Sequence, residues 1–182
     1  ASNNTAVGYQ AGYNLTGGAN TAIGYQTLFN SSTNTNCAAV GSGALAQCTG
    51  SYNTAIGSNA GGGNTTGVNN FFGGINAGAN LTTGSYNIII GSNCQPSENS
   101  NIGTIVIGYD GTTGKGSNTG FINANGGGVY QGNNSASWST TSDARIKENV
   151  VDLASGLSVV NALRPVEFED RKSTRLNSSH TD

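Results

Sequence analysis

The sequence predicts an all-β protein, a parallel β-solenoid or β-roll of 16–18-residue repeats, and three observations lead to that fold class. A short pattern that closes on glycine recurs through residues 4–108. Each repeat has two strand-sized pieces and two turn signals, without helical spacing. Glycine and asparagine, 29 and 26 of 182 residues, both tolerate left-handed corners. Because one such unit cannot bury its own apolar face, the repeats must stack on one another.

The repeated strand pattern defines the predicted shaft, residues 1–110. Its seven copies are "NTAVG", "NTAIG", "CAAVG", "NTAIG", "NNFFG", "NIIIG" and "TIVIG", which close on glycines 8, 24, 41, 57, 73, 91 and 108. Turns such as "LTGGAN" and "CTGSYN" separate the copies. We expect asparagine side chains to stack in hydrogen-bonded ladders. We also expect one continuous apolar ladder in register along the stack, formed by Val7, Ile23, Val40, Ile56, Phe72, Ile90 and Ile107.

The predicted core of each coil is small. Alanine often stands beside valine or isoleucine in the strand pattern. A coil of about 16 residues therefore buries little apolar area by itself. We expect association to bury the apolar area that one coil cannot bury alone, with three copies of the chain sharing the apolar ladder around one axis as a homotrimer.

The "NTAxG" pattern with its Thr-Gly turns resembles the repeats of phage tail fibres and tailspikes. It is also similar to the β-roll heads of trimeric autotransporter adhesins. The resemblance covers about residues 3–110 and implies a structural segment that binds a host-cell glycan or protein receptor. The implied location is the virion tail or, in the alternative, a bacterial cell surface. Adhesins of that type end in a coiled coil, which does not follow here, so we favour the tail-fibre interpretation.

Charge changes abruptly at residue 143. The first 142 residues contain three charged residues, Glu98, Asp110 and Lys115, whereas the last 40 contain thirteen. Residues 111–141 remain rich in turn and β-forming residues, and we expect a tapering neck there. The near neutrality of the shaft argues against a nucleic-acid surface, which requires clustered Lys and Arg. The absence of a long apolar run argues against membrane insertion.

The charged segment begins with a different pattern. An apolar stripe at helical spacing is followed by Pro165, which ends the predicted helix, and by "VEFE", which alternates as a strand does. The stripe consists of Leu153, Leu157, Val160 and Leu163. Residues 142–170 therefore predict part of a small globular α+β domain.

"SDARIKENV" and "NALRPVEF" in this segment resemble the start of the intramolecular chaperone that ends endosialidase tailspikes and many tail fibres. The family helps three chains find register and then cleaves itself from them. By this resemblance Ser142 matches the nucleophile, Lys147 matches its base, and the cleaved bond lies between Ser142 and Asp143. Ala144 departs from the family, which often has an acidic residue there.

The assigned peptidase chemistry is physically reasonable. A serine hydroxyl needs a neighbouring base, and a lysine can supply it if desolvation lowers its pKa. His180 is the sole histidine, so a Ser-His-Asp triad has little support. The alternative is that Ser142 only caps a turn and Lys147 is a solvated charge. Residues 171–182, "RKSTRLNSSHTD", do not continue the family pattern and resemble a translated sequencing adapter, so we expect a non-native tail and no cleavage by this chain.

Cys37, Cys48 and Cys94 form an irregular odd set without a CxxC pair. Cys48 stands where the first repeat has Leu15, so we interpret it as a small buried apolar residue, with disulfide or thiol chemistry as the alternative. The scattered Cys and the single His offer no pattern for a metal site, and no cofactor is expected.

Tyr9, Tyr25 and Tyr109 each follow a repeat glycine. Tyrosine can stack on sugar rings while its hydroxyl remains hydrogen-bonded, so these residues are candidates for receptor binding. The alternative is that they only pack between coils. An ice-binding solenoid would need regular Thr-x-Thr rows, and a glycan-cleaving spike would need paired carboxylates, for which Glu98 and Asp110 are too few.

Overall fold

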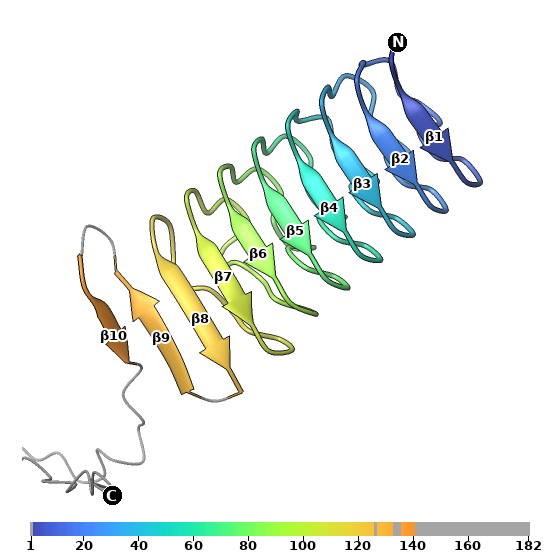
Figure 1. Ribbon diagram of the computed structural model, residues 1–182. Coiled ribbons are helices and arrows are strands. Elements are labelled where there is room, and N and C mark those ends of the chain that lie inside the picture. The colour runs from blue at the N-terminus through green and yellow to red at the C-terminus, as the bar shows by residue number, and fades with distance from the viewer. Residues whose placement is uncertain (1, 126, 133–135, 141–182) are drawn as a thin grey trace, which may run out of the picture. The chain divides into compact units, whose positions relative to one another are not determined.

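The computed structural model describes residues 2–125, 127–132 and 136–140. These residues form one sheet of ten strands that lie side by side in chain order (Figure 1). The strands are β1 (Thr5–Val7), β2 (Thr21–Ile23), β3 (Ala38–Val40), β4 (Thr54–Ile56), β5 (Phe71–Gly73), β6 (Ile88–Ile90), β7 (Ile105–Gly108), β8 (Gly120–Ala124), β9 (Gly127–Gln131) and β10 (Trp138–Thr140). The described part contains no helix, and the predicted all-β parallel solenoid is confirmed.

Strands β1 to β8 pair in parallel, one strand from each coil. In each coil the chain leaves the strand, turns behind the sheet and returns one step further along, as Figure 1 shows. Backbone hydrogen bonds join the coils at the corners as well as in the strands. The Gly12 amide, for example, donates to the Thr27 carbonyl over 2.8 Å. The solenoid thus satisfies its backbone groups from one coil to the next.

The middle residue of each three-residue strand faces the interior of the coil. This inner row consists of Ala22, Ala39, Ala55, Phe72, Ile89 and Val106, all fully buried. Leucines at 28, 45 and 81, from the chain behind the sheet, complete the core. Because side chains alternate along a strand, the first and third residues of each strand must face the other way.

The predicted apolar ladder lies in register, and most of it faces outward and not into the coil. Six of its seven members occupy the third strand position, and five of these, Val7, Ile23, Val40, Ile56 and Ile90, are 37–57 % exposed. The small alanines beside them fill the interior instead. In the second to fourth coils the inner position holds alanine, whereas in the fifth to seventh it holds Phe72, Ile89 and Val106, so the space inside each coil decides which residue it encloses.

The fifth copy of the repeat was also placed one residue too early. Phe72 pairs with Ala55 and Ile89 in the inner row, whereas Gly73 pairs with Ile56 and Ile90 on the outer face. The closing glycine of this coil is Gly74, not Gly73. A one-residue slip in a strand reverses every side chain, which is why Phe72 is the member of the predicted ladder that is buried.

The closing glycines allow adjacent coils to approach closely. Gly57 has φ of +138°, and a Cβ built on it would lie 2.4 Å from the carbonyl oxygen of Gly74 in the next coil. Gly74 meets Gly91 in a similar way, with φ of +125°. Only glycine combines this backbone conformation with such close contact.

A buried row of asparagines crosses the coils just before the strands, as the sequence predicted. The Asn70 side chain donates to the Gly84 carbonyl over 2.9 Å. Its Oδ1 accepts the Asn87 amide over 3.0 Å. Asn53 and Asn87 make the same two kinds of contact with their own neighbours. Each side chain therefore pairs buried backbone groups that would otherwise be left unsatisfied.

The sheet changes direction after β8, because β9 and β10 pair with their neighbours in antiparallel fashion. These strands lie in the stretch that we assigned to the neck, residues 111–141. The predicted chaperone segment, residues 142–170, and the predicted non-native tail, residues 171–182, lie outside the described residues.

Candidate functional site

The outward side of the parallel sheet carries a continuous apolar surface. We call it the apolar face and define it by the first and third residues of strands β1 to β8. Its exposed members are Val7, Ile23, Val40, Ile56, Ile88, Ile90, Ile105 and Ile122. Parallel sheets are normally covered on both faces, and large exposed apolar patches mark interaction sites. The sequence analysis predicted the ladder that supplies more than half of these residues, but it did not establish that the ladder faces outward.

The two rows of the apolar face differ in composition. The third-position row is aliphatic in every coil except the fifth, where Gly73 stands. The first-position row begins with Thr5, Thr21, Ala38 and Thr54 and becomes apolar with Phe71, Ile88 and Ile105. One row is thus apolar along its whole length, and the other is apolar only toward the C-terminal coils.

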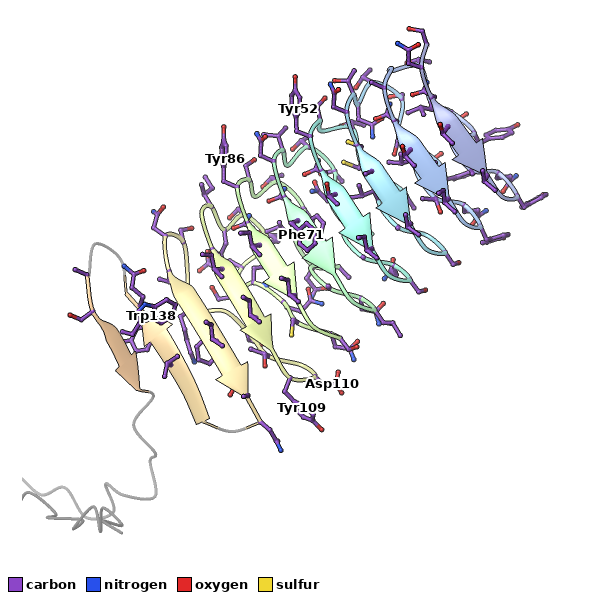
Figure 2. The ribbon with its side chains drawn as sticks, viewed as in Figure 1. Tyr52, Phe71, Tyr86, Tyr109, Asp110 and Trp138 are labelled. Atoms are coloured by element: carbon purple, nitrogen blue, oxygen red, sulfur yellow. The ribbon has the colours of Figure 1, made fainter. Side chains whose placement is uncertain are left out.

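Aromatic rings cover the two glycines of the face. A Cβ built on Gly73 would lie 3.2 Å from Cε1 of Phe71, so this ring lies beside the gap in the aliphatic row. A Cβ built on Gly120 in β8 would likewise lie 3.1 Å from Cη2 of Trp138 in β10. Figure 2 shows Phe71 over the strands and Trp138 at the β10 end of the sheet. The apolar surface therefore continues past both glycines.

The charged side chains of the described residues lie away from the apolar face. Asp110, just after β7, accepts a hydrogen bond of 2.5 Å from Asn93 and ends an exposed ladder of amides that begins at Asn59. The Lys115 ammonium lies 4.6 Å from the centre of the Phe121 ring. Glu98 lies in the turn between β6 and β7 and is exposed. The apolar face is therefore electrically neutral.

The three tyrosines predicted to bind a receptor do not form one cluster. Tyr9 and Tyr25 stack on each other, with ring centroids 5.6 Å apart and planes 11° apart. Both rings remain more than half exposed. Tyr109 follows β7, five coils beyond Tyr25, and has Asp110 as its neighbour (Figure 2). The structure thus brings two of the three together and leaves the third apart.

Tyr52 and Tyr86 are among the further exposed tyrosines that the sequence analysis did not single out. Both stand at the corner before the strand, two coils apart, and point away from the sheet in the same direction (Figure 2). Their φ angles are +63° and +62°, a left-handed conformation that bulky residues rarely adopt. The repeated "SYN" at 51–53 and 85–87 is the signal that could have identified them.

The predicted catalytic pair lies elsewhere in the chain. Ser142, Asp143 and Lys147 are outside the described residues, so the assigned cleavage chemistry stays a prediction. Within the described ranges there is no cluster of three or more metal-ligating side chains and no enclosed pocket. Nor does that part of the chain contain a helix of the length and apolarity needed to cross a membrane.

Comparison with protein-family models, with curated proteins and with solved structures found no match to this chain.

Proposed function

We propose that this chain is the shaft of a homotrimeric fibre or spike, a structural segment that carries a receptor-binding surface away from its base. The observation that supports this most directly is the apolar face, a neutral row of half-exposed aliphatic side chains that runs the length of the parallel sheet. Burial of each such side chain in an assembly would contribute about 1 kcal/mol.

A second copy of the same chain is the partner that fits this face best. The aliphatic residues recur with each strand, at the strand spacing of about 4.8 Å. A partner that covers them all must present apolar groups at the same spacing over the same length. Another copy of the chain does so because it has the same repeats. The absence of charge on this face also means that copies can approach without like-charge repulsion.

Three copies suit the composition of the face better than two. If three copies meet at an axis, one row from each reaches the centre and the adjacent row lies further out. The consistently aliphatic row, with Ile56 as an example, would take the central position. The row that contains Thr5, Thr21 and Thr54 would take the outer one, where hydroxyl groups can keep contact with water.

The wider role rests on resemblance. We propose that the fibre belongs to a phage virion tail, attaches to a host glycan or protein receptor, and is assembled with a self-cleaving chaperone that begins at Ser142. The support is the likeness of the repeats to tail-fibre repeats and of "SDARIKENV" to the chaperone's opening motif.

Sedimentation equilibrium of the 182-residue chain tests the assembly. We expect three times the mass of one chain for the unmodified protein. Ile56→Lys should reduce this to the mass of a monomer, because it introduces three charges at the proposed axis. Ile75→Lys is the matched control, since Ile75 is exposed to a similar extent, 55 % against 52 %, but lies off the apolar face.

The control variant should remain trimeric. A folded monomer for the unmodified chain, or a trimer that tolerates Ile56→Lys, would overturn the proposed arrangement. A stable dimer would retain the apolar face as the interface but reject the three-fold axis.

A further inference from the structure

The interior of the third coil contains two thiols. Cys37 precedes β3 and occupies the place that Asn20 and Asn53 hold in neighbouring coils. Cys48 follows in the same coil, at the position of Leu81 in the fifth coil. Both side chains are buried, with exposed fractions of 2 % and 0 %. Cys48 is buried as the sequence analysis expected, yet its surroundings are not purely apolar.

The two sulfur atoms share their polar surroundings. Sγ of Cys37 and Sγ of Cys48 lie 3.5 and 3.2 Å from the same acceptor, the Gly50 carbonyl oxygen. The Asn53 side chain donates to the Cys48 sulfur over 3.3 Å. Two sulfur atoms that contact one carbonyl oxygen must lie near each other. This proximity is the arrangement from which a short side-chain movement forms a disulfide.

The proximity of the two thiols also shifts their pKa values in opposite directions. The hydrogen bond from Cys48 lowers the pKa of Cys37 to about 7, against the opposing effect of burial. The same contact, together with burial, raises the pKa of Cys48. In the closed coil, Cys37 is therefore the thiol that ionises first.

We propose that Cys37 and Cys48 form an intramolecular disulfide when the chain meets a disulfide oxidant such as oxidised glutathione. One of the two cysteines, written here as Cys37, attacks as a thiolate one sulfur of the oxidant, whose other sulfur leaves as a thiolate. Cys48 then loses its proton and attacks the Cys37 sulfur in the mixed disulfide, which releases the second thiolate. The two protons end on the two released thiols, so two protein thiols are oxidised and one oxidant disulfide is reduced.

Burial decides when this reaction occurs. The oxidant cannot reach the sulfur atoms in the closed coil, so the bond forms as the chain folds or while the third coil is open. Once formed, it joins residues on both sides of one coil and limits the freedom of the unfolded chain. The expected consequence is a shaft that is more resistant to heat in its oxidised form.

Cys94 provides an internal comparison. It is buried three coils further on, and its sulfur lies 3.4 and 3.5 Å from the carbonyl oxygens of Gly108 and Tyr109. Burial raises its pKa. Its contacts in the described residues include no second thiol, so the same oxidant should not give it a disulfide partner within the chain.

The test is to unfold the full chain under reducing conditions and refold it with oxidised glutathione. We expect the intact mass to fall by that of two hydrogen atoms. Unreduced chymotryptic peptides from either side of Leu45 should remain cross-linked. The midpoint of thermal unfolding should rise by roughly 10 °C relative to the protein refolded with reduced glutathione.

Three variants make the result specific. Cys37→Asn restores the residue of the neighbouring coils and Cys48→Ser places there the residue of the second coil, Ser31, so both are compatible with the fold. Each should abolish the mass loss and the rise in midpoint, whereas Cys94→Ala should retain both. An unchanged mass in the unmodified chain, or a cross-link to Cys94, would overturn the proposal. A Cys37–Cys48 bond that leaves the midpoint unchanged would refute its stabilising role.

Discussion

Single residues set the spacing between coils. The closing glycines bring consecutive backbones into contact, and the buried asparagines pair the backbone groups that this contact encloses. Gly57 illustrates the first role, because it has neither the backbone conformation nor the space for a side chain. Asn70 illustrates the second, since it contacts both Gly84 and Asn87. The two residue types are abundant because most coils use both.

Substitution of a closing glycine should therefore destabilise the shaft more than substitution of a turn glycine that does not contact the next coil. Gly57→Ala forces a methyl group into the Gly74 carbonyl in a backbone conformation that is nearly restricted to glycine, and should cost about 3 kcal/mol or more. Gly43→Ala is the control, because φ is +68° but no atom lies within 4 Å of the added Cβ. Its expected cost is about 1 kcal/mol.

The two variants are compared by thermal unfolding, followed by circular dichroism. Equal losses of stability would show that backbone conformation alone, and not contact between coils, decides the requirement for glycine at position 57.

At the scale of the strand, the side chains of successive strands form two kinds of row, one inside the coil and one on its outer face. A three-residue strand points one side chain inward and two outward, so a coil has a narrow core and a broader outer face. The side chains beside the strands form further rows, of which the Tyr9–Tyr25 stack is one. Such repeated rows place similar groups at regular spacing on the surface.

The stacked pair belongs to the proposed receptor-binding role. Simultaneous substitution of Tyr9, Tyr25 and Tyr109 by alanine should reduce binding on a glycan array by roughly tenfold or more, because exposed tyrosine rings can stack on sugars. The control changes Tyr52 and Tyr86 to asparagine, which tolerates their left-handed conformation, and should leave binding intact. Undiminished binding by the triple variant would remove these tyrosines from the proposed site.

At the scale of the whole chain, we expect the nearly uncharged shaft and the charged C-terminal segment to be separated by cleavage. In a parent protein with a complete chaperone, we expect cleavage between Ser142 and Asp143 after assembly. Ser142→Ala and Lys147→Ala should each leave an uncut chain in denaturing gels while the product remains trimeric, because the nucleophile or its base is missing. The 182-residue chain should not cleave itself.

Normal cleavage of a Lys147→Ala parent would reject the assigned base. Efficient cleavage of the 182-residue chain would show that the segment after residue 170 is not needed to build the site.

The repeat period, the glycine corners and the asparagine ladder were all predictable from the sequence, because each depends on local backbone requirements that recur with every coil. The resemblance of the C-terminal segment to a chaperone also came from sequence, and its residues 142–170 are not among those described here. The aromatic corners at Tyr52 and Tyr86 were not predicted, because bulky residues are uncommon in a left-handed conformation.

The tertiary structure decided which apolar residues lie inside. The sequence pattern does not say which of two neighbouring apolar residues faces the interior. Alanine lies inside next to the outward Ile23 and Ile56, whereas Ile89 lies inside further along the stack. Register in the fifth coil was equally ambiguous, since two phenylalanines precede two glycines and either glycine could close the pattern. Gly74 closes the coil because its backbone contacts Gly91 in the next coil. A contact between two coils cannot be read from the sequence of one repeat.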